Sequence, residues 1–155
     1  TGAAPAALGR VVAARWGAAI GRGPVPLFSH GSQALRRYGA GGARAEAMAG
    51  FPSVYEIALP ALRTTASAQH GAVQACFALI AQVSDTNLLH RGGSEGARFA
   101  ADQAASFLAD GGIRAPGWQA RAVSVHEAFV ARHLSPGGCA DLLAMALFID
   151  ALSRP

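Results

Sequence analysis

The stretch "GAVQACFALIAQVS", residues 71–84, decides the fold that this sequence predicts. It contains no aspartate, glutamate, lysine or arginine. On a helix its larger apolar side chains point in several directions: Val73, Phe77, Leu79, Ile80 and Val83. A helix that is apolar almost all round must be covered by neighbours on several sides. We therefore expect residues 71–84 to form the central helix of the protein.

Helical periodicity also dominates the rest of the chain, and no stretch alternates like a strand. Four apolar residues at steps of four, three and four share one helix face, which should pack inward: Trp118, Ala122, Val125 and Phe129. A second buried helix should follow Ser135 as its cap and Pro136 in its first turn. Other helices are expected over residues 6–20, 32–38, 43–49 and 53–65, the last either tolerating Pro60 or kinking there. A further helix, capped by Ser94, should run to Gly111. The sequence predicts an all-α fold, a compact multi-helix domain with glycine-rich loops at the helix entrances.

The composition fits one folded domain spanning residues 1–155. The chain has 155 residues, of which 52% are hydrophobic and 14% charged, and this is far from the composition of disordered proteins. Asp141 and Asp150 interrupt the most apolar segment, so no membrane span is expected. The first residues lack a secretory signal, and Cys76 and Cys139 follow no disulfide or CxxC pattern. A reduced, cytoplasmic protein is the simplest interpretation.

The positive charge comes entirely from arginine. The net charge is +4, and the sequence contains no lysine. Nonspecific nucleic-acid surfaces usually combine both residue types in dense patches, whereas these arginines are scattered or lie beside glycines. The pattern favours discrete contacts to phosphate or carboxylate groups, and no nucleic-acid partner is expected.

The acidic residue Asp85 opens the polar segment "DTNLLHRGG" directly after the predicted central helix. We expect it at the C-terminal end of that helix, where the helix dipole disfavours negative charge. Arg91 or a divalent cation could then offset the charge, and Asn87 could add a neutral oxygen ligand. The alternative is that Asp85 caps the next turn through its side chain.

Two further carboxylates are candidates for chemistry. Glu46 follows Arg44 by two residues, so on a helix their side chains point to different faces; the alternative to catalysis is an ion pair with a distant arginine. Asp141 lies in the first turns of an apolar helix, which the dipole favours, so its role could be structural. With Asp85 or Glu46 it could also form an acidic cluster that holds magnesium on a polyphosphate.

Glycine pairs lie at two expected helix entrances, Gly92-Gly93 and Gly137-Gly138. Glycine there lets backbone N–H groups approach an anion, although glycine also simply makes turns.

Three stretches in this order resemble the triphosphoribosyl-dephospho-CoA synthases: "RRYGAGGARAEAMAGFPSVYEIALP", "DTNLLHRGG" and "SPGGCADLLAMALF". The resemblance runs from about Gln33 to the end of the chain. Ala45 replaces a glycine and Cys139 a serine that are common in the family, and both are small residues. Family members look about twice as long, so the chain resembles their C-terminal half. The resemblance then implies a missing N-terminal half that completes the enzyme.

The resemblance implies a transferase that moves the triphosphoribosyl group of ATP to the 2′-hydroxyl of 3′-dephospho-CoA and releases adenine. The product is the prosthetic-group precursor for an acyl carrier protein of malonate decarboxylase or citrate lyase, and the sequence does not distinguish these two pathways. Such a reaction passes through a state with positive charge on the sugar, which a carboxylate can stabilise.

The resemblance also suggests roles for individual residues. The catalytic candidates are Asp85, Glu46 and Asp141, and Asp85 and Asp141 would also hold Mg²⁺. The candidates for binding nucleotide or phosphate are Arg44, Asn87, Arg91, Gly92, Gly93, Gly137 and Gly138. Asp85→Asn is expected to abolish turnover of the intact enzyme and to leave its fold in place. A helical domain that binds nucleotides without catalysis, a purely structural role for the motifs, and a homo-oligomer remain open.

Overall fold

The computed structural model describes residues 7–25 and 28–153, and all regular structure in these ranges is helical. This confirms the all-α prediction; Ala6, at the start of the first predicted helix, lies outside the described residues. The helices are α1 (Leu8–Arg22), α2 (His30–Tyr38), α3 (Gly42–Ala49), α4 (Leu59–Leu62), α5 (Ala68–Gln82), α6 (Thr86–Ala109), α7 (Trp118–Ala131) and α8 (Gly137–Ser153). A π-helical turn, Val54–Ala58, precedes α4, and a 3₁₀ turn, Gly112–Arg114, precedes α7.

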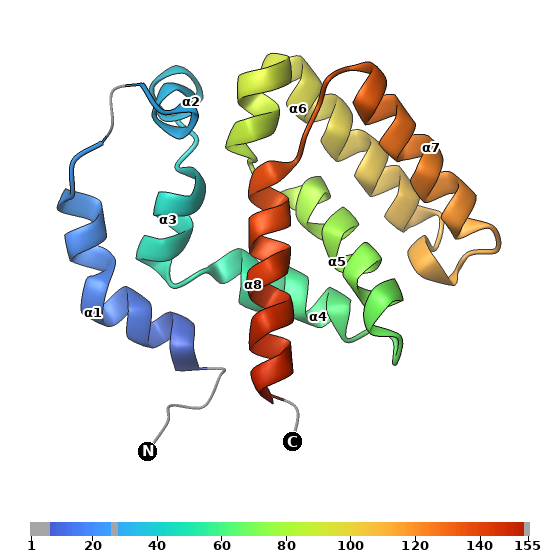
Figure 1. Ribbon diagram of the computed structural model, residues 1–155, viewed down its shortest axis with the longest axis horizontal. Coiled ribbons are helices and arrows are strands. Elements are labelled where there is room, and N and C mark those ends of the chain that lie inside the picture. Colours follow the sequence, from blue (N-terminus) through green and yellow to red (C-terminus); the bar gives the residue numbers. More distant parts are fainter. Residues whose placement is uncertain (1–6, 26–27, 154–155) are drawn as a thin grey trace.

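Helix α5 lies at the centre, with α4, α6 and α8 packed against it (Figure 1). Ala75 and Leu79 have no exposed surface, and Phe77 stacks on Phe107 of α6 with ring centroids 3.9 Å apart. The absence of charged side chains on this helix therefore has the predicted cause, because neighbours cover it from several directions.

Helices α6 and α7 lie side by side on the right of Figure 1. The predicted inner face of α7 is confirmed: Phe129 is buried, and Trp118, Ala122 and Val125 pack against the core. At the top of the view, α2 covers the first turns of α6 through a small cluster that contains Ala34, Ala40 and Leu89. None of the helices in the described ranges has the length and apolar character needed to span a bilayer.

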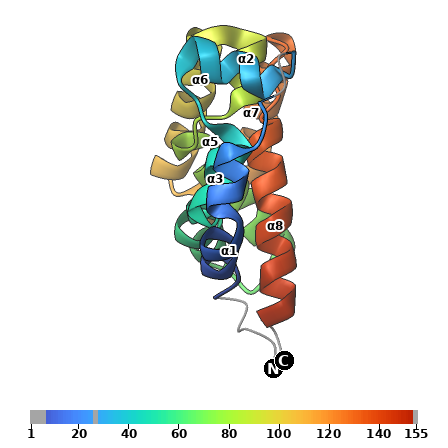
Figure 2. The ribbon, with the colours of Figure 1, turned by 90° about the vertical axis from the view of Figure 1, so that its left-hand side faces the viewer.

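Helix α8 is less buried than predicted. Cys139, Leu142, Ala146 and Ile149 face the core, but its opposite side is exposed. Figure 2 shows the reason, because α8 runs along one edge of the molecule. Within the described residues it is packed from one side only.

The helix entrance expected at Gly92-Gly93 lies inside a helix, because the polar segment that follows α5 is itself helical. Helix α6 starts at Thr86 and bends at Gly93, whose φ of 62° and ψ of −165° are non-helical. The bend, rather than a cap at Ser94, divides the two halves of α6. The first half can form because Asp85 caps it, and the bend is allowed because glycine tolerates these dihedral angles.

The helix predicted over residues 53–65 is present but irregular near Pro60, where a kink was one of the expected outcomes. It is divided into the π-helical turn and the short α4. Pro60 has no N–H to donate to the carbonyl group of Glu56, and a π-helical turn accommodates such a gap in the ladder.

Substitution of Gly93 tests whether the bend in α6 requires glycine. Gly93→Ala should destabilise the protein by about 1–3 kcal/mol, because a side chain is strained at these dihedral angles. Gly31→Ala is the matched control, since Gly31 lies in α2 with no atom near the position of an added Cβ. It should be neutral or slightly stabilising. Urea unfolding compares the two, and equal stabilities would contradict the account.

Candidate functional site

One pocket collects residues from all three of the quoted stretches. It has a volume of about 620 Å³ and lies where α3, the start of α6 and the start of α8 meet. Glu46, Asp85 and Asp141 all line it, together with Asn87 and Gly138. The three carboxylates predicted as catalytic candidates therefore share a single pocket.

Asp85 is buried, with 3% of its surface exposed, at the junction of α6 and α8. Its Oδ1 accepts hydrogen bonds from the backbone N–H groups of Asn87 (2.7 Å) and Leu88 (3.2 Å). Its Oδ2 accepts one from the backbone N–H of Cys139 (2.8 Å), in the first turn of α8. One carboxylate thus caps the N-termini of two helices.

The predicted position of Asp85 was therefore wrong, and the alternative, a capping role, is correct. Helix α5 ends at Gln82, so Asp85 faces the positive ends of two helix dipoles and not a negative one. These helix ends supply the expected positive partner. Arg91 is exposed and is not among the residues that line the pocket.

The start of α8 also differs from the prediction. The helix begins at Gly137, and the carbonyl group of Pro136 accepts its first hydrogen bond from the N–H of Ala140 at 3.0 Å. The side chain that binds a first-turn N–H is Asp85, which is far away in sequence, and not Ser135. A Cβ at Gly137 would lie 2.3 Å from Nδ2 of Asn87, so the absence of a side chain there lets the two helix starts meet.

Glu46 is half-buried and is held by Ser53. Its Oε1 accepts a hydrogen bond from Oγ of Ser53 at 2.5 Å, and its Oε2 accepts one from the backbone N–H of the same residue at 3.2 Å. Ser53 also lines the pocket. These contacts, rather than an ion pair with an arginine, fix Glu46. Sequence reasoning missed Ser53, because nothing in its local pattern marks it as the partner of a residue on α3.

Asp141 completes the acidic group from the first turns of α8. It lines the pocket while its side chain stays exposed to solvent. Of the three carboxylates it is therefore the one most open to a ligand.

Arg44 points to the end of α1 instead of the acidic pocket. Its guanidinium group donates to the carbonyl groups of Gly21 (2.9 Å), Gly23 (2.5 Å) and Pro24 (3.3 Å). It also lines a neighbouring pocket of about 320 Å³, which shares four residues with the acidic pocket: Gly41, Gly42, Ala43 and Thr86. Arg44 thus lies beside the acidic pocket, and its assignment to a phosphate stays a prediction.

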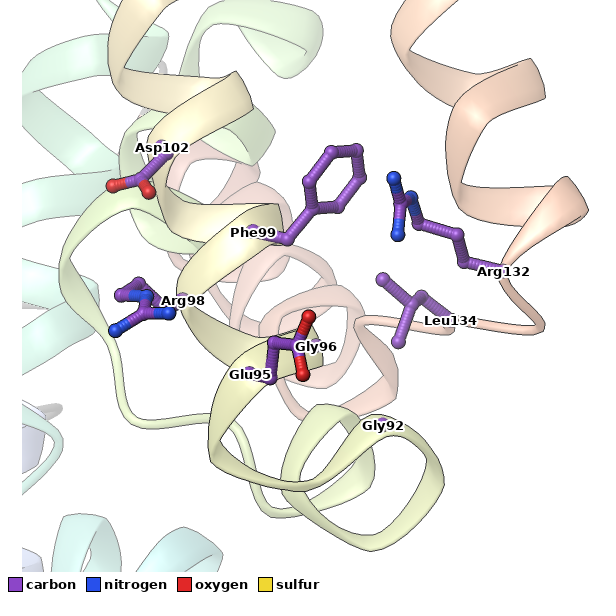
Figure 3. A pocket seen from close by; sticks show the side chains of 8 residues that line it. All are labelled: Gly92, Glu95, Gly96, Arg98, Phe99, Asp102, Arg132 and Leu134. Atoms are coloured by element: carbon purple, nitrogen blue, oxygen red, sulfur yellow. The ribbon is translucent and has the colours of Figure 1, made fainter.

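Gly92 lies in a third pocket, of about 460 Å³, between the second half of α6 and the chain that follows α7 (Figure 3). The guanidinium group of Arg132 stacks over Phe99 there, 4.0 Å from the ring centroid, and Leu134 lies opposite Gly92. Gly93, like Gly92, is not among the residues that line the acidic pocket. The structure therefore does not bring these two glycines together with the carboxylates, whereas Gly138 lies among them.

The donors present fit a magnesium ion only if a ligand completes its coordination. In the described part of the chain, no three His, Cys, Asp or Glu side chains gather closely enough to hold a metal ion. Three backbone N–H groups and the thiol of Cys139 hydrogen-bond the carboxylate of Asp85, whereas Asp141 is exposed. Magnesium commonly binds one or two carboxylates together with phosphate oxygens and water. The pocket suits that mode and not an all-protein cage.

Comparison with known proteins identifies the family. A family model described as ATP:dephospho-CoA triphosphoribosyl transferase matches residues 8–155. The chain belongs to this family. Among relatives named probable 2-(5''-triphosphoribosyl)-3'-dephosphocoenzyme-A synthase, the one from Pseudomonas fluorescens (strain Pf0-1) is 39% identical over 135 residues, which cover 84% of this chain and 46% of the relative.

Two further relatives of the same name give the same result. The protein from Pseudomonas putida is 41% identical over 81% of this chain and 46% of its own length. The protein from Azotobacter vinelandii (strain DJ / ATCC BAA-1303) is 41% identical over 83% of this chain and 46% of its own length. The chain thus spans less than half the length of these family members. No solved structure matches it.

Removal of the Asp85 carboxylate should destabilise the fold. Asp85→Ala should lower the free energy of unfolding by about 2–4 kcal/mol, because two helix caps are lost and buried N–H groups lose their acceptor. Asp85→Asn should cost less, since an amide oxygen can still cap α6 while only one of the two helix starts loses its acceptor. Asp102→Ala, at an exposed position on α6, is the control and should change stability by less than about 0.5 kcal/mol. Equal unfolding midpoints for all three variants would contradict the capping role.

The buried thiol of Cys139, at the junction of α6 and α8, should make the free energy of unfolding fall at high pH. Burial, and secondarily the charge of Asp85, raises the pKa of Cys139, and burial raises the pKa of Cys76. Above a pH of about 8.5 the unfolded chain releases these protons while the folded chain keeps them, so the free energy of unfolding falls as pH rises, by about 1 kcal/mol per pH unit for each thiol. Cys139→Ala should reduce this slope in unfolding experiments between about pH 8.5 and 9.5. An unchanged slope would contradict the prediction.

Proposed function

We propose that this chain carries part of the site at which the triphosphoribosyl group of ATP is transferred to the 2′-hydroxyl of 3′-dephospho-CoA, with release of adenine. The observation that supports this most directly is the shared pocket of Glu46, Asp85 and Asp141, three carboxylates from separate parts of the sequence. Family membership supports the choice of reaction.

The three carboxylates differ in what they can do chemically. The bond between C1′ of the ribose and adenine breaks, a bond from C1′ to the attacking oxygen forms, and the hydroxyl proton balances the proton that adenine needs. A carboxylate can take that proton or stabilise positive charge on the sugar. Asp141 is exposed and Glu46 is oriented by Ser53, so these two are suited to contact the reacting groups. Asp85, with three of its lone pairs occupied, chiefly positions α6 and α8.

The phosphates and their counterion would lie near the starts of α6 and α8. Bound Mg²⁺ would neutralise charge on the triphosphate, and the exposed Asp141, together with Asp85, would hold it. Gly138 lets the substrate approach the backbone at the start of α8. Asn87 can bind a phosphate or ribose oxygen through its amide, and Arg44 can reach ligand groups that enter the neighbouring pocket.

The rest of the active site would come from the region of the longer relatives that lies outside the part matching this chain, since the shared part is only 46% of their length. The product would serve as the prosthetic-group precursor for an acyl carrier protein of malonate decarboxylase or citrate lyase, made in the cytoplasm. The same partial coverage favours a second candidate, nucleotide binding by this chain without turnover.

A chimera tests the reaction. This chain would replace the matching region of the Pseudomonas putida relative, and adenine release would be followed by chromatography with ATP and dephospho-CoA as substrates. Asp141→Asn should lower kcat by about 100-fold or more, since a group that acts on the reacting atoms is lost. Asp102→Asn, an exposed position on α6, is the control and should keep full activity.

Two outcomes would contradict the proposal: an active chimera in which Asp141→Asn retains full kcat, or a folded chimera that releases no adenine. The second candidate is tested with this chain alone. Binding of magnesium-ATP at 100 times its Kd should stabilise the chain by about 2.7 kcal/mol and raise its melting temperature. A rise without turnover in the chimera would favour nucleotide binding alone.

A further inference from the structure

The outer face of α8 is apolar and exposed, which is unusual for a surface helix. Between Leu142 and Ile149 the sequence contains no charged residue. Phe148 is 59% exposed and Leu152 is 55% exposed, and Leu147 is also exposed. The other exposed apolar residues of this outer face are alanines: Ala140, Ala144 and Ala151.

A surface helix normally carries polar side chains on the face that it turns to water, whereas a helix that is apolar all round is buried. Helix α5 follows that rule, because other helices cover it from several sides. Helix α8 has the same kind of sequence but lies along the edge of the molecule (Figure 2). Its outer face therefore has the character of an interface.

This face continues the wall of the acidic pocket. Asp141, Met145, Phe148 and Leu152 are spaced by four, three and four residues, so they form one row along α8. Asp141 and Met145, in the first half of the row, line the pocket, while Phe148 and Leu152 are largely exposed. A polypeptide seated on Phe148 and Leu152 would lie directly beside the pocket.

We infer that this face binds the part of the family protein that the longer relatives carry outside the region they share with this chain. More than half of each relative compared lies outside that region, since the shared part covers 46% of its length. A face whose exposed side chains are all apolar from Ala144 to Leu152 is typical of contacts within one protein or a permanent complex. The occupant would present a complementary apolar surface and close the pocket next to Asp141. The inference rests on family membership and not on the proposed reaction.

Co-expression tests the interface. This chain would be produced together with a tagged version of the outside region of the Pseudomonas putida relative, and co-elution would be measured without any nucleotide. The wild-type chain should co-elute. Phe148→Glu should reduce the co-eluted amount by about tenfold or more, because a charge would be placed in an apolar contact. Ala144→Arg, on the same face, should do the same.

Val123→Glu is the matched control, because Val123 on α7 is similarly exposed, at 54%. It should co-elute like the wild-type chain, and circular dichroism melting should show that all the variants are folded. Equal co-elution of Phe148→Glu and Val123→Glu would overturn the inference, and so would a wild-type chain that never co-elutes.

Light scattering on the chain alone tests whether a second copy of the same chain occupies this face. A homodimer that Phe148→Glu dissociates would overturn the inference and identify a second copy as the occupant. Because no step requires ATP or adenine release, failure here is distinct from failure of the proposed reaction.

Discussion

The carboxylate of Asp85 holds together the part of the structure on which the pocket depends. A buried, unpaired carboxylate would be costly, but this one accepts hydrogen bonds from three backbone N–H groups. The helices that supply them each carry a partial positive charge of about half a unit at the N-terminus, so together they roughly balance the carboxylate. The contact also fixes the start of α6 against the start of α8, and the pocket lies where these two helix ends face α3.

This arrangement gives the three acidic residues different environments. Asp85 is buried and almost fully hydrogen-bonded, Glu46 is half-buried and held by one serine, and Asp141 is exposed. A loss of turnover after substitution of Asp85 would therefore have two physical causes, displaced helices and a missing carboxylate. The same loss at Asp141 would be simpler to interpret, because the side chain makes no structural contact comparable to those of Asp85. The structure thus revises the expectation for Asp85→Asn, which should lower stability because one of the two helix starts loses its acceptor.

Local patterns predicted the parts of the fold that depend on neighbours in sequence. The uncharged stretch before Asp85 identified α5, and the spacing from Trp118 to Phe129 identified the inner face of α7. Contacts between distant residues were not predictable in this way. Asp85 and Cys139 are 54 positions apart, and Arg44 binds carbonyl groups 20 to 23 positions before it. A cluster of Asp141 with Asp85 or Glu46 was one alternative suggested by the residue types. The family resemblance then assigned all three carboxylates to one site, which no local rule could do for residues so far apart in sequence.

Helices α5 and α8 show why an apolar sequence is an incomplete guide to burial. Both lack charged side chains over most of their length, and both were predicted to be core helices. Among residues 7–25 and 28–153, neighbours cover α5 from several sides, while α8 is covered from one. Solvation gives no reason to keep Phe148 and Leu152 exposed, because covering them would gain roughly 2 kcal/mol for each side chain. A polypeptide on this face would therefore bind beside the only fully open carboxylate of the acidic group, so its docking and the closure of the pocket would be energetically linked.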